Sequence, residues 1–343
     1  MQTAQRMLSP YRMMRRSRAK PWLSRVGLYV LTVWAVLTLN FFLPRAMPGD
    51  PILEMQDPSS NLYVTDVDAR ARLAAYYGLD RPLLDQYVHY LTGLAAGDLG
   101  WSIRMSTPVI DLIGAHLPWT LLLVIPSLVC ASIITVLIGA HSAWRRGSRL
   151  DRFLLATFSV LRTIPIFFLG VLALMVFSVN LDWLPLAGAN TPFHVWQTPW
   201  EQAGDVFQHW LLPASLLIIE MISGRYLLMR NSMIAVLGED YMFVARAKGL
   251  PNRVIEFRHG VRNAMLPLIT AFSTQLALAV AGVIFIETLF AYPGMGRLMF
   301  DAVAARDYPV LQGTFLVVAL SVLTVNLLTD LAYGWLDPRV KQA

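Results

Sequence analysis

Charged residues are scarce in this chain. They make up 15% of its 343 residues, whereas an ordinary soluble domain carries about 25%. Hydrophobic residues make up 56%, and the mean hydropathy is +0.52. A soluble protein of this length needs a charged surface around its core, and this chain lacks the charge to form one. The composition therefore excludes an ordinary soluble domain and indicates an integral membrane protein.

The sequence patterns of enzymes are also missing. Cys130 is the sole cysteine, so no internal disulfide can form. The six histidines do not recur at a metal-binding spacing such as His-x3-His, and there is no Gly-x-Ser-x-Gly elbow. No Gly-x-x-x-x-Gly-Lys-Ser/Thr loop is present. We therefore expect no catalytic residue, no metal and no cofactor on this chain.

Six apolar runs are long enough to span a membrane, which takes about 20 helical residues. Arg162 interrupts the third run and Glu220 the fourth, and the other four carry no charge. Each run must be helical because lipid offers no partners for backbone N–H and C=O groups. We predict an all-α integral membrane protein with six transmembrane helices. The runs are 26–44, 112–144, 153–181, 206–224, 263–286 and 308–329.

The basic residues predict the orientation. Four segments that alternate across six spans hold 20 of the 28 Lys and Arg residues: 1–25, 145–152, 225–262 and 339–341. The positive-inside rule places these segments, and both termini, in the cytoplasm. The basic region at 1–25 is too long for a cleavable signal, so we expect an uncleaved anchor. The positive-inside bias then accounts for the pI of about 9.6. We therefore expect no nucleic-acid partner.

This topology predicts a basic N-terminus, 1–25, and one transmembrane domain, 26–343, with large loops. The first outside loop, 45–111, is acidic and should be helical. One helix is expected between Thr65 and Gly78, and another from Pro82 to about Gly97. A second outside loop covers 182–205.

The basic loop 225–262 predicts a helix, a tight turn and another helix. Gly249 suits the turn, and Pro251 can start the second helix but cannot continue the first. A short helix with a small apolar face and a charged flank suits docking into a groove of a partner. The alternative is an ordinary inside loop whose charge only sets topology.

The residue motif of this loop favours docking to a partner. Ala245-Arg-Ala-Lys-Gly249, with His259, Arg262-Asn263 and Leu266-Pro267 after it, resembles the coupling signature of ABC-importer permeases of the dipeptide, oligopeptide and nickel branch. Phe243-Val244-Ala245 stands where the general importer pattern has Glu-Ala-Ala, as in that branch. Further phrases resemble the family in the same order: 45–51, 77–82, 97–102, 117–120, 287–290, 293–297, 326–330 and 337–339.

The resemblance implies a permease subunit of an ATP-driven importer for peptides or similar small solutes in the bacterial inner membrane. The resemblance implies that it forms half of the translocation path beside a second homologous permease in the lipid membrane. It also implies two ABC ATPase subunits, which would bind ATP and Mg, and an extracytoplasmic solute-binding protein. The implied ATPase-coupling residues are Glu239, Asp240, Ala245, Arg246, Ala247, Lys248, Gly249 and Leu250.

Two acids are candidates for the path or its gate. Glu220 falls inside the fourth run, where an ionised acid costs about 2.5–3.5 kcal/mol, so it should face protein or a cavity. It would contact a solute amine, or form a buried pair with Arg225 or Arg162. Glu287, near the outer end of the fifth run, would form the outer gate or fix a loop. The chief rival function, an ion-gradient-driven secondary transporter, would favour several intramembrane acids.

Overall fold

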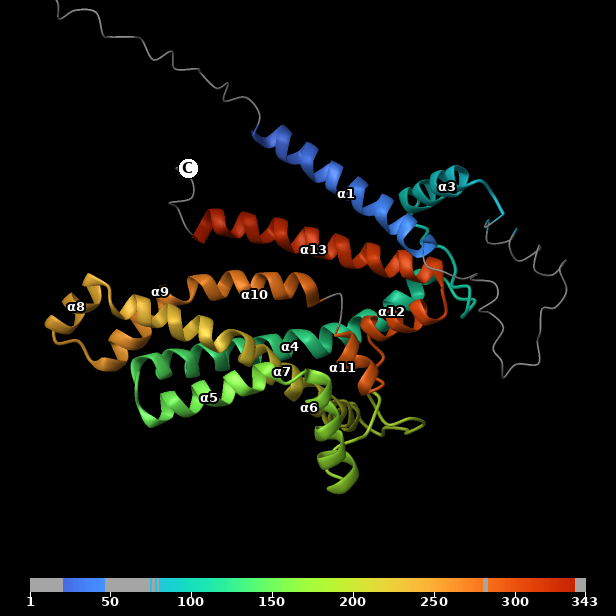
Figure 1. Cartoon of the computed structure of the whole chain (residues 1–343). Coiled ribbons are helices and arrows are strands. Elements are labelled where there is room, and N and C mark those ends of the chain that lie inside the picture. Colours follow the sequence, from blue (N-terminus) through green and yellow to red (C-terminus); the bar gives the residue numbers. More distant parts are fainter. Residues whose placement is uncertain (1–20, 47–74, 76–77, 79, 280–282, 337–343) are drawn as a thin grey trace, which may run out of the picture.

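The described part of the chain is helical. The computed structural model describes residues 21–46, 75, 78, 80–279 and 283–336, and its regular structure is helix apart from one isolated bridge between Trp101 and Pro108. Figure 1 shows a long bundle with short helices at both ends. The all-α prediction is confirmed for these residues. The expected helix between Thr65 and Gly78, and the segments 1–20 and 337–343, fall almost wholly outside them.

The helices follow one another in the order of the chain. They are α1 (Pro21–Arg45), α3 (Leu83–Ala95), α4 (Val109–Trp144), α5 (Arg149–Thr163), α6 (Ile166–Ala173), the π-helical η1 (Leu174–Asn180), α7 (Pro199–Leu237), α8 (Asp240–Ala247), the π-helical η2 (Val254–Val261), α9 (Arg262–Ala264), α10 (Leu266–Leu278), α11 (Ile284–Leu289), α12 (Met295–Ala304) and α13 (Tyr308–Leu336). The predicted helix at 82–97 is α3.

Three helices in the described residues are long and apolar enough to cross a membrane: α4, α7 and the first 20 residues of α13. A fourth candidate is the pair formed by α5 with α6 and η1, which bends by 98°. Shorter apolar helices cover 29–45 and 266–276. These elements coincide with the six runs read from the sequence, and the count of six complete spans stays a prediction.

The bend corrects the expectation of one straight span at 153–181. Pro165 stands just before the first residue of α6, and Ile164 is extended. A residue before proline is driven out of the helical region because the pyrrolidine ring clashes with it. The chain therefore stops α5 at Thr163 and restarts in a new direction.

The two longest helices, α4 and α7, lie side by side and form the centre of the bundle (Figure 1). Their core includes Leu123, Leu217 and Tyr226, all essentially buried. Gly139 permits close approach, since a Cβ there would lie 2.8 Å from the Met229 side chain. α13 packs on α1 and α10.

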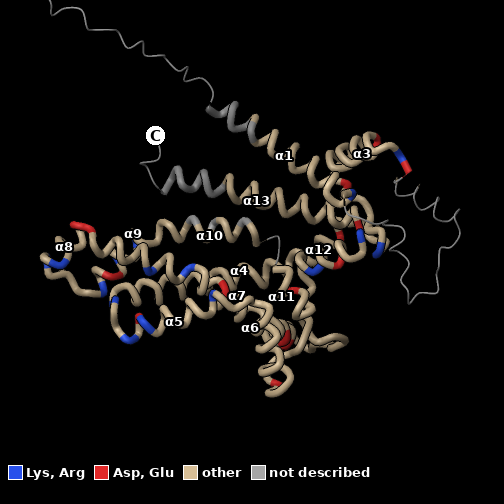
Figure 2. Tube along the Cα trace, viewed as in Figure 1, with Lys and Arg blue, Asp and Glu red and all other residues tan. Residues whose placement is uncertain are grey.

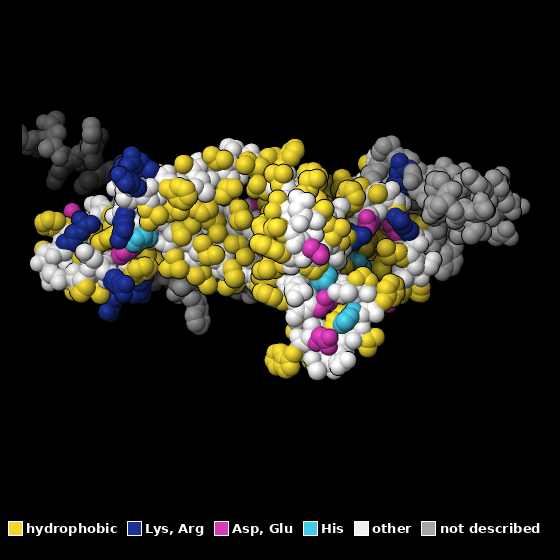
Figure 3. All heavy atoms as spheres, turned by 90° about the horizontal axis from the view of Figure 1, so that it is seen from below, with side chains coloured by type: hydrophobic (Ala, Val, Ile, Leu, Met, Phe, Trp, Pro, Cys, Tyr) yellow, Lys and Arg dark blue, Asp and Glu magenta, His cyan; other side chains and the backbone are white. Residues whose placement is uncertain are grey.

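Charge is distributed as a membrane protein requires. Figure 2 shows Lys and Arg gathered at the end of the bundle that carries α8 and the start of α5, with few charges along the middle. Figure 3 shows that the middle of one face is covered by hydrophobic side chains. Large exposed residues such as Ile133, Phe168 and Leu172 are suited to contact with lipid.

Candidate functional site

The helix α8 is held against the basic end of the bundle by its inward face. Met242 and Ala245 are buried there and pack with Ile255, Trp144 and Leu250. The three-residue spacing of Met242 and Ala245 places both side chains on one side of a helix. Of the predicted coupling residues, Ala245 is therefore buried against this chain, and Leu250, just after the helix, is partly buried against the same cluster.

The outward face of α8 is apolar and basic. Phe243 is 74% exposed, Val244 and Tyr241 are exposed as well, and Ala247 and Lys248 lie on the surface. The Arg246 guanidinium lies 5.7 Å from the centre of the Trp144 ring. The predicted Glu239 and Asp240 are exposed at the start of the helix. Phe243 and Tyr241 were missing from the residues predicted for this surface, although the inward spacing of their neighbours could have indicated them.

A glycine turn ends α8. Gly249 has φ +69°, a left-handed conformation that glycine adopts without steric cost. The Gly249 N–H donates to the Arg246 carbonyl at 2.9 Å, and the Leu250 N–H donates to the Ala245 carbonyl at 3.4 Å. Both bonds satisfy carbonyls at the helix end. The predicted turn at Gly249 is confirmed, and a second break at Gly238 separates α8 from α7.

Polar contacts connect α8 and its neighbours to the spanning helices. Asn263 Nδ2 of α9 donates to the Tyr241 hydroxyl at 2.9 Å. His141 Nδ1 on α4 lies 3.2 Å from Glu256 Oε1 on η2. Together with the packing of Met242 and Ala245, these contacts place α8 directly against α4, α7 and α9.

A half-buried polar group lies between α7 and α10. Arg225 Nη2 donates to Gln275 Oε1 at 2.9 Å, and the guanidinium lies 5.3 Å from the centre of the Phe272 ring. Glu220 is exposed on α7 and forms no ion pair with any described residue. This part of α7 offers an acid and a guanidinium within five residues of one another.

Glu287 lies in a buried hydrogen-bonded cluster. Its side chain is fully buried and accepts from Thr120 Oγ1 at 2.8 Å and from the Arg297 N–H at 3.1 Å. Thr120 Oγ1 in turn accepts from the Met295 N–H at 2.7 Å. The carboxylate thus joins α11 to α12 and α4, which is the arrangement expected of a residue that fixes a loop. Its predicted role in a gate stays a prediction.

Among the described residues, no group of three His, Cys, Asp or Glu side chains could hold a metal ion. The described residues thus offer an exposed apolar and basic helix face on α8, a polar group beside α7 and the buried carboxylate of Glu287.

Comparison with known proteins gives the chain its family. Residues 132–342 match the family described as "Binding-protein-dependent transport system inner membrane component". The chain is 37% identical to the oligopeptide transport system permease protein AppB of Bacillus subtilis, over 89% of this chain and 94% of the relative. It is 35% identical to the dipeptide transport system permease protein DppB of Escherichia coli, over 93% and 98%. Identity to the glutathione transport system permease protein GsiC of Escherichia coli is also 35%, over 90% and 95%.

Proposed function

The chain belongs to the inner membrane components of binding-protein-dependent transport systems, and from this membership we propose that α8 couples it to separate ATPase subunits. It is therefore a permease component of the inner membrane rather than an enzyme. The observation that supports coupling is the division of α8 into two faces. Met242 and Ala245 fix the helix to the bundle, while Phe243 and Val244 are presented outward beside Lys248.

An exposed aromatic residue next to cations is well suited to a partner groove. Interface energy is concentrated in a few buried aromatic and basic residues, which cost 2 kcal/mol or more when truncated. We infer that Phe243 is such a residue and that Arg246 and Lys248 flank it. The sequence holds no phosphate-binding loop of its own, so ATP and Mg belong to the ATPase subunits.

Coupling would work as a shift between two arrangements of the bundle. ATP-driven closure of two ATPase subunits would draw the α8 helices of two permeases together and favour an outward-open path, and hydrolysis would return it. The tight packing of α8 on the bundle, with Met242 fully buried, supports such coupling because a rigid connection transmits displacement. The second permease subunit would complete the path, and the extracytoplasmic binding protein would deliver the solute.

We infer a peptide or similar small solute, since relatives named for oligopeptide and dipeptide transport cover nearly the whole chain. A peptide presents an ammonium and a carboxylate, and Glu220 and Arg225 on α7 offer the two complementary charges. We infer that the exposed Glu220 lies in the translocation path, where it would contact the ammonium group of the peptide.

Co-purification tests the docking proposal. The permease would be isolated from its native membrane as wild type, Phe243→Glu and Phe193→Glu, and the ATPase subunits retained with it would be quantified. Phe193 is the matched control, an exposed aromatic residue in the predicted outside loop. Phe243→Glu should lower retention about tenfold or more because it places a charge in an apolar groove. Equal retention by all three proteins would refute the role of α8.

A further inference from the structure

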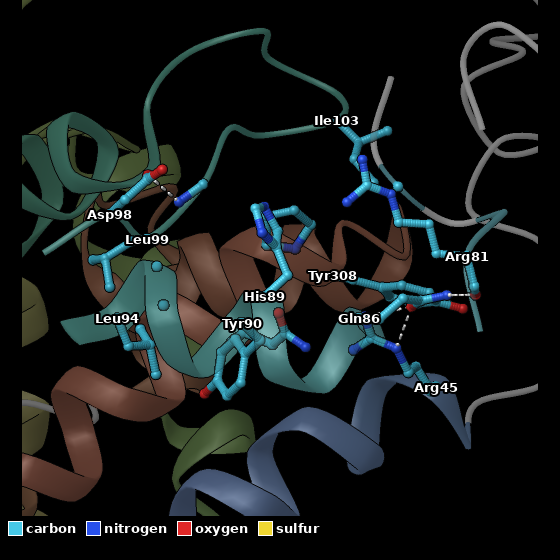
Figure 4. A pocket seen from close by; sticks show the side chains of 16 residues that line it. Arg45, Arg81, Gln86, His89, Tyr90, Leu94, Asp98, Leu99, Ile103 and Tyr308 are labelled. Atoms are coloured by element: carbon cyan, nitrogen blue, oxygen red, sulfur yellow. Dashed lines mark hydrogen bonds between the residues drawn. The ribbon is translucent and has the colours of Figure 1, made fainter. Parts of the chain in front are cut away.

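A cavity of about 210 Å³ lies at the end of the molecule away from α8. It is an open cavity lined by the end of α1, by α3, by residues 98–103 and by the first two turns of α13, as the close view shows (Figure 4). The docking helix and the polar group on α7 do not contribute to it. Its lining therefore needs an explanation separate from coupling.

One end of the cavity is cationic. Arg45 and Arg81 both line it, and neither forms an ion pair with a carboxylate among the described residues. Arg45 is held in place, since its Nε and Nη2 donate to Gln86 Oε1 at 3.2 and 3.0 Å. A guanidinium has five N–H donors, so Arg45 has donors left after these bonds and the one to the Phe41 carbonyl.

A buried donor in the same cavity lacks an acceptor. Gln312 lines the wall and is only 9% exposed, and its Nε2 has no hydrogen-bond partner in the described part of the chain. Its main-chain carbonyl accepts from Asn40 Nδ2 at 2.7 Å, which fixes the backbone there. Buried polar groups are nearly always satisfied, so an orphaned donor requires an explanation, and a bound water or ion is one.

The remaining polar groups make the two ends of the cavity different in charge. Asp98 lies across the cavity from Arg45 and Arg81 in Figure 4, and its Oδ1 accepts from the Gly100 N–H at 2.8 Å. Burial raises the pKa of Tyr90 above its ordinary value, so its phenol stays neutral. An anion would therefore be placed at the arginine end, away from Asp98.

We propose that this cavity binds an oxyanion, a carboxylate or a phosphate, held by the guanidinium groups of Arg45 and Arg81 and by Gln312 Nε2. All three are donors, and carboxylate and phosphate oxygens are acceptors of matching geometry. The site goes beyond ATPase coupling and does not depend on it. Two sources carry this chemistry: the carboxylate of a short peptide and the phosphate of an anionic lipid headgroup.

Two variants separate the site from general surface charge. Arg81→Gln removes an exposed cation for which no side-chain hydrogen bond is seen, and Gln312→Met removes the orphaned donor while keeping the side-chain length. Arg104→Gln is the matched control, since Arg104 is exposed on the same end and lies outside the cavity lining. Thermal unfolding would confirm that each variant is folded.

The experiment is native mass spectrometry of the full chain in a neutral detergent. The probes are phosphatidylglycerol, alanyl-alanine and alanyl-alanine amide, each titrated separately. We expect one bound copy of the lipid or of the free-acid peptide, and no binding of the amide. Arg81→Gln should weaken binding about tenfold and Gln312→Met about fivefold, with no change for Arg104→Gln.

The choice between the lipid and the free-acid peptide identifies the source of the oxyanion. Failure of both probes to bind overturns the proposal. It is also overturned if Gln312→Met binds as well as the wild type, because water alone would then satisfy this donor and Asn40 Oδ1, which is likewise unpartnered among the described residues.

Discussion

The Arg230 guanidinium donates two hydrogen bonds to the Asp151 carboxylate, from Nε to Oδ1 at 2.7 Å and from Nη2 to Oδ2 at 2.8 Å. Asp151 also accepts from Ser142 Oγ and from the Gly147 N–H. This buried bidentate pair joins α7 to the start of α5, close to the elements that hold α8.

Asp151→Asn should destabilise the protein by about 3 kcal/mol, because it leaves the largely buried Arg230 charge without its partner. The free energy of unfolding in detergent would be compared with that of Arg230→Gln and of the double variant. The double variant should cost less than the sum of the single changes. Strictly additive losses would show that the two residues contribute independently.

Gly249→Pro should abolish ATP-dependent uptake while the protein still inserts into the membrane. Proline fixes φ near −65°, and Gly249 has φ +69°. Gly249→Asn is the control, since asparagine tolerates the left-handed region, and it should retain most uptake. Uptake in membrane vesicles measures both. Normal transport by the proline variant would remove the turn after α8 from the coupling mechanism.

Glu220→Gln should change solute preference if this exposed acid lines the path. The ratio of uptake of a cationic peptide to a neutral one should fall about two- to fivefold, the size of one partly exposed charge interaction. Glu201→Gln, an acid at the start of the same helix, should leave the ratio unchanged. An unaltered ratio in Glu220→Gln would place this acid outside the path.

Gly296→Ala should destabilise the cluster around Glu287 by about 1–3 kcal/mol. A Cβ at Gly296 would lie 2.9 Å from Glu287 Oε2 and 3.0 Å from Ile284 Cα, which is backbone and cannot move aside. Gly114→Ala on α4 meets nothing within 4 Å and serves as the control. Thermal unfolding of both variants checks this, and equal midpoints would contradict the packing of α11 on α12.

Local signals in the sequence were sufficient for much of the fold. Pro82 and Gly97 delimit α3 and Gly249 forms the turn after α8, since proline and glycine act through their own backbone angles. The direction of α6 was not predictable in the same way. Pro165 indicates a break, but the 98° angle depends on packing with distant helices.

In the candidate sites, too, some features have a local signal in the sequence and others arise only from packing. The motif from Ala245 to Gly249 predicts a docking segment, yet which of its side chains face outward follows from contacts with Trp144 and Ile255. The bond between Thr120 and Glu287 joins residues 167 positions apart. Neither relationship has a local signature, because each arises only when the helices pack.

Photo-crosslinking from position 243 tests the central claim most directly. A photoreactive phenylalanine analogue would replace Phe243, and in a second protein Phe193, and the products formed in native membranes would be identified by mass spectrometry. The account predicts that position 243 cross-links to an ATPase subunit carrying a phosphate-binding loop and that position 193 does not. Cross-links from 243 only to lipid or to this chain itself would contradict it.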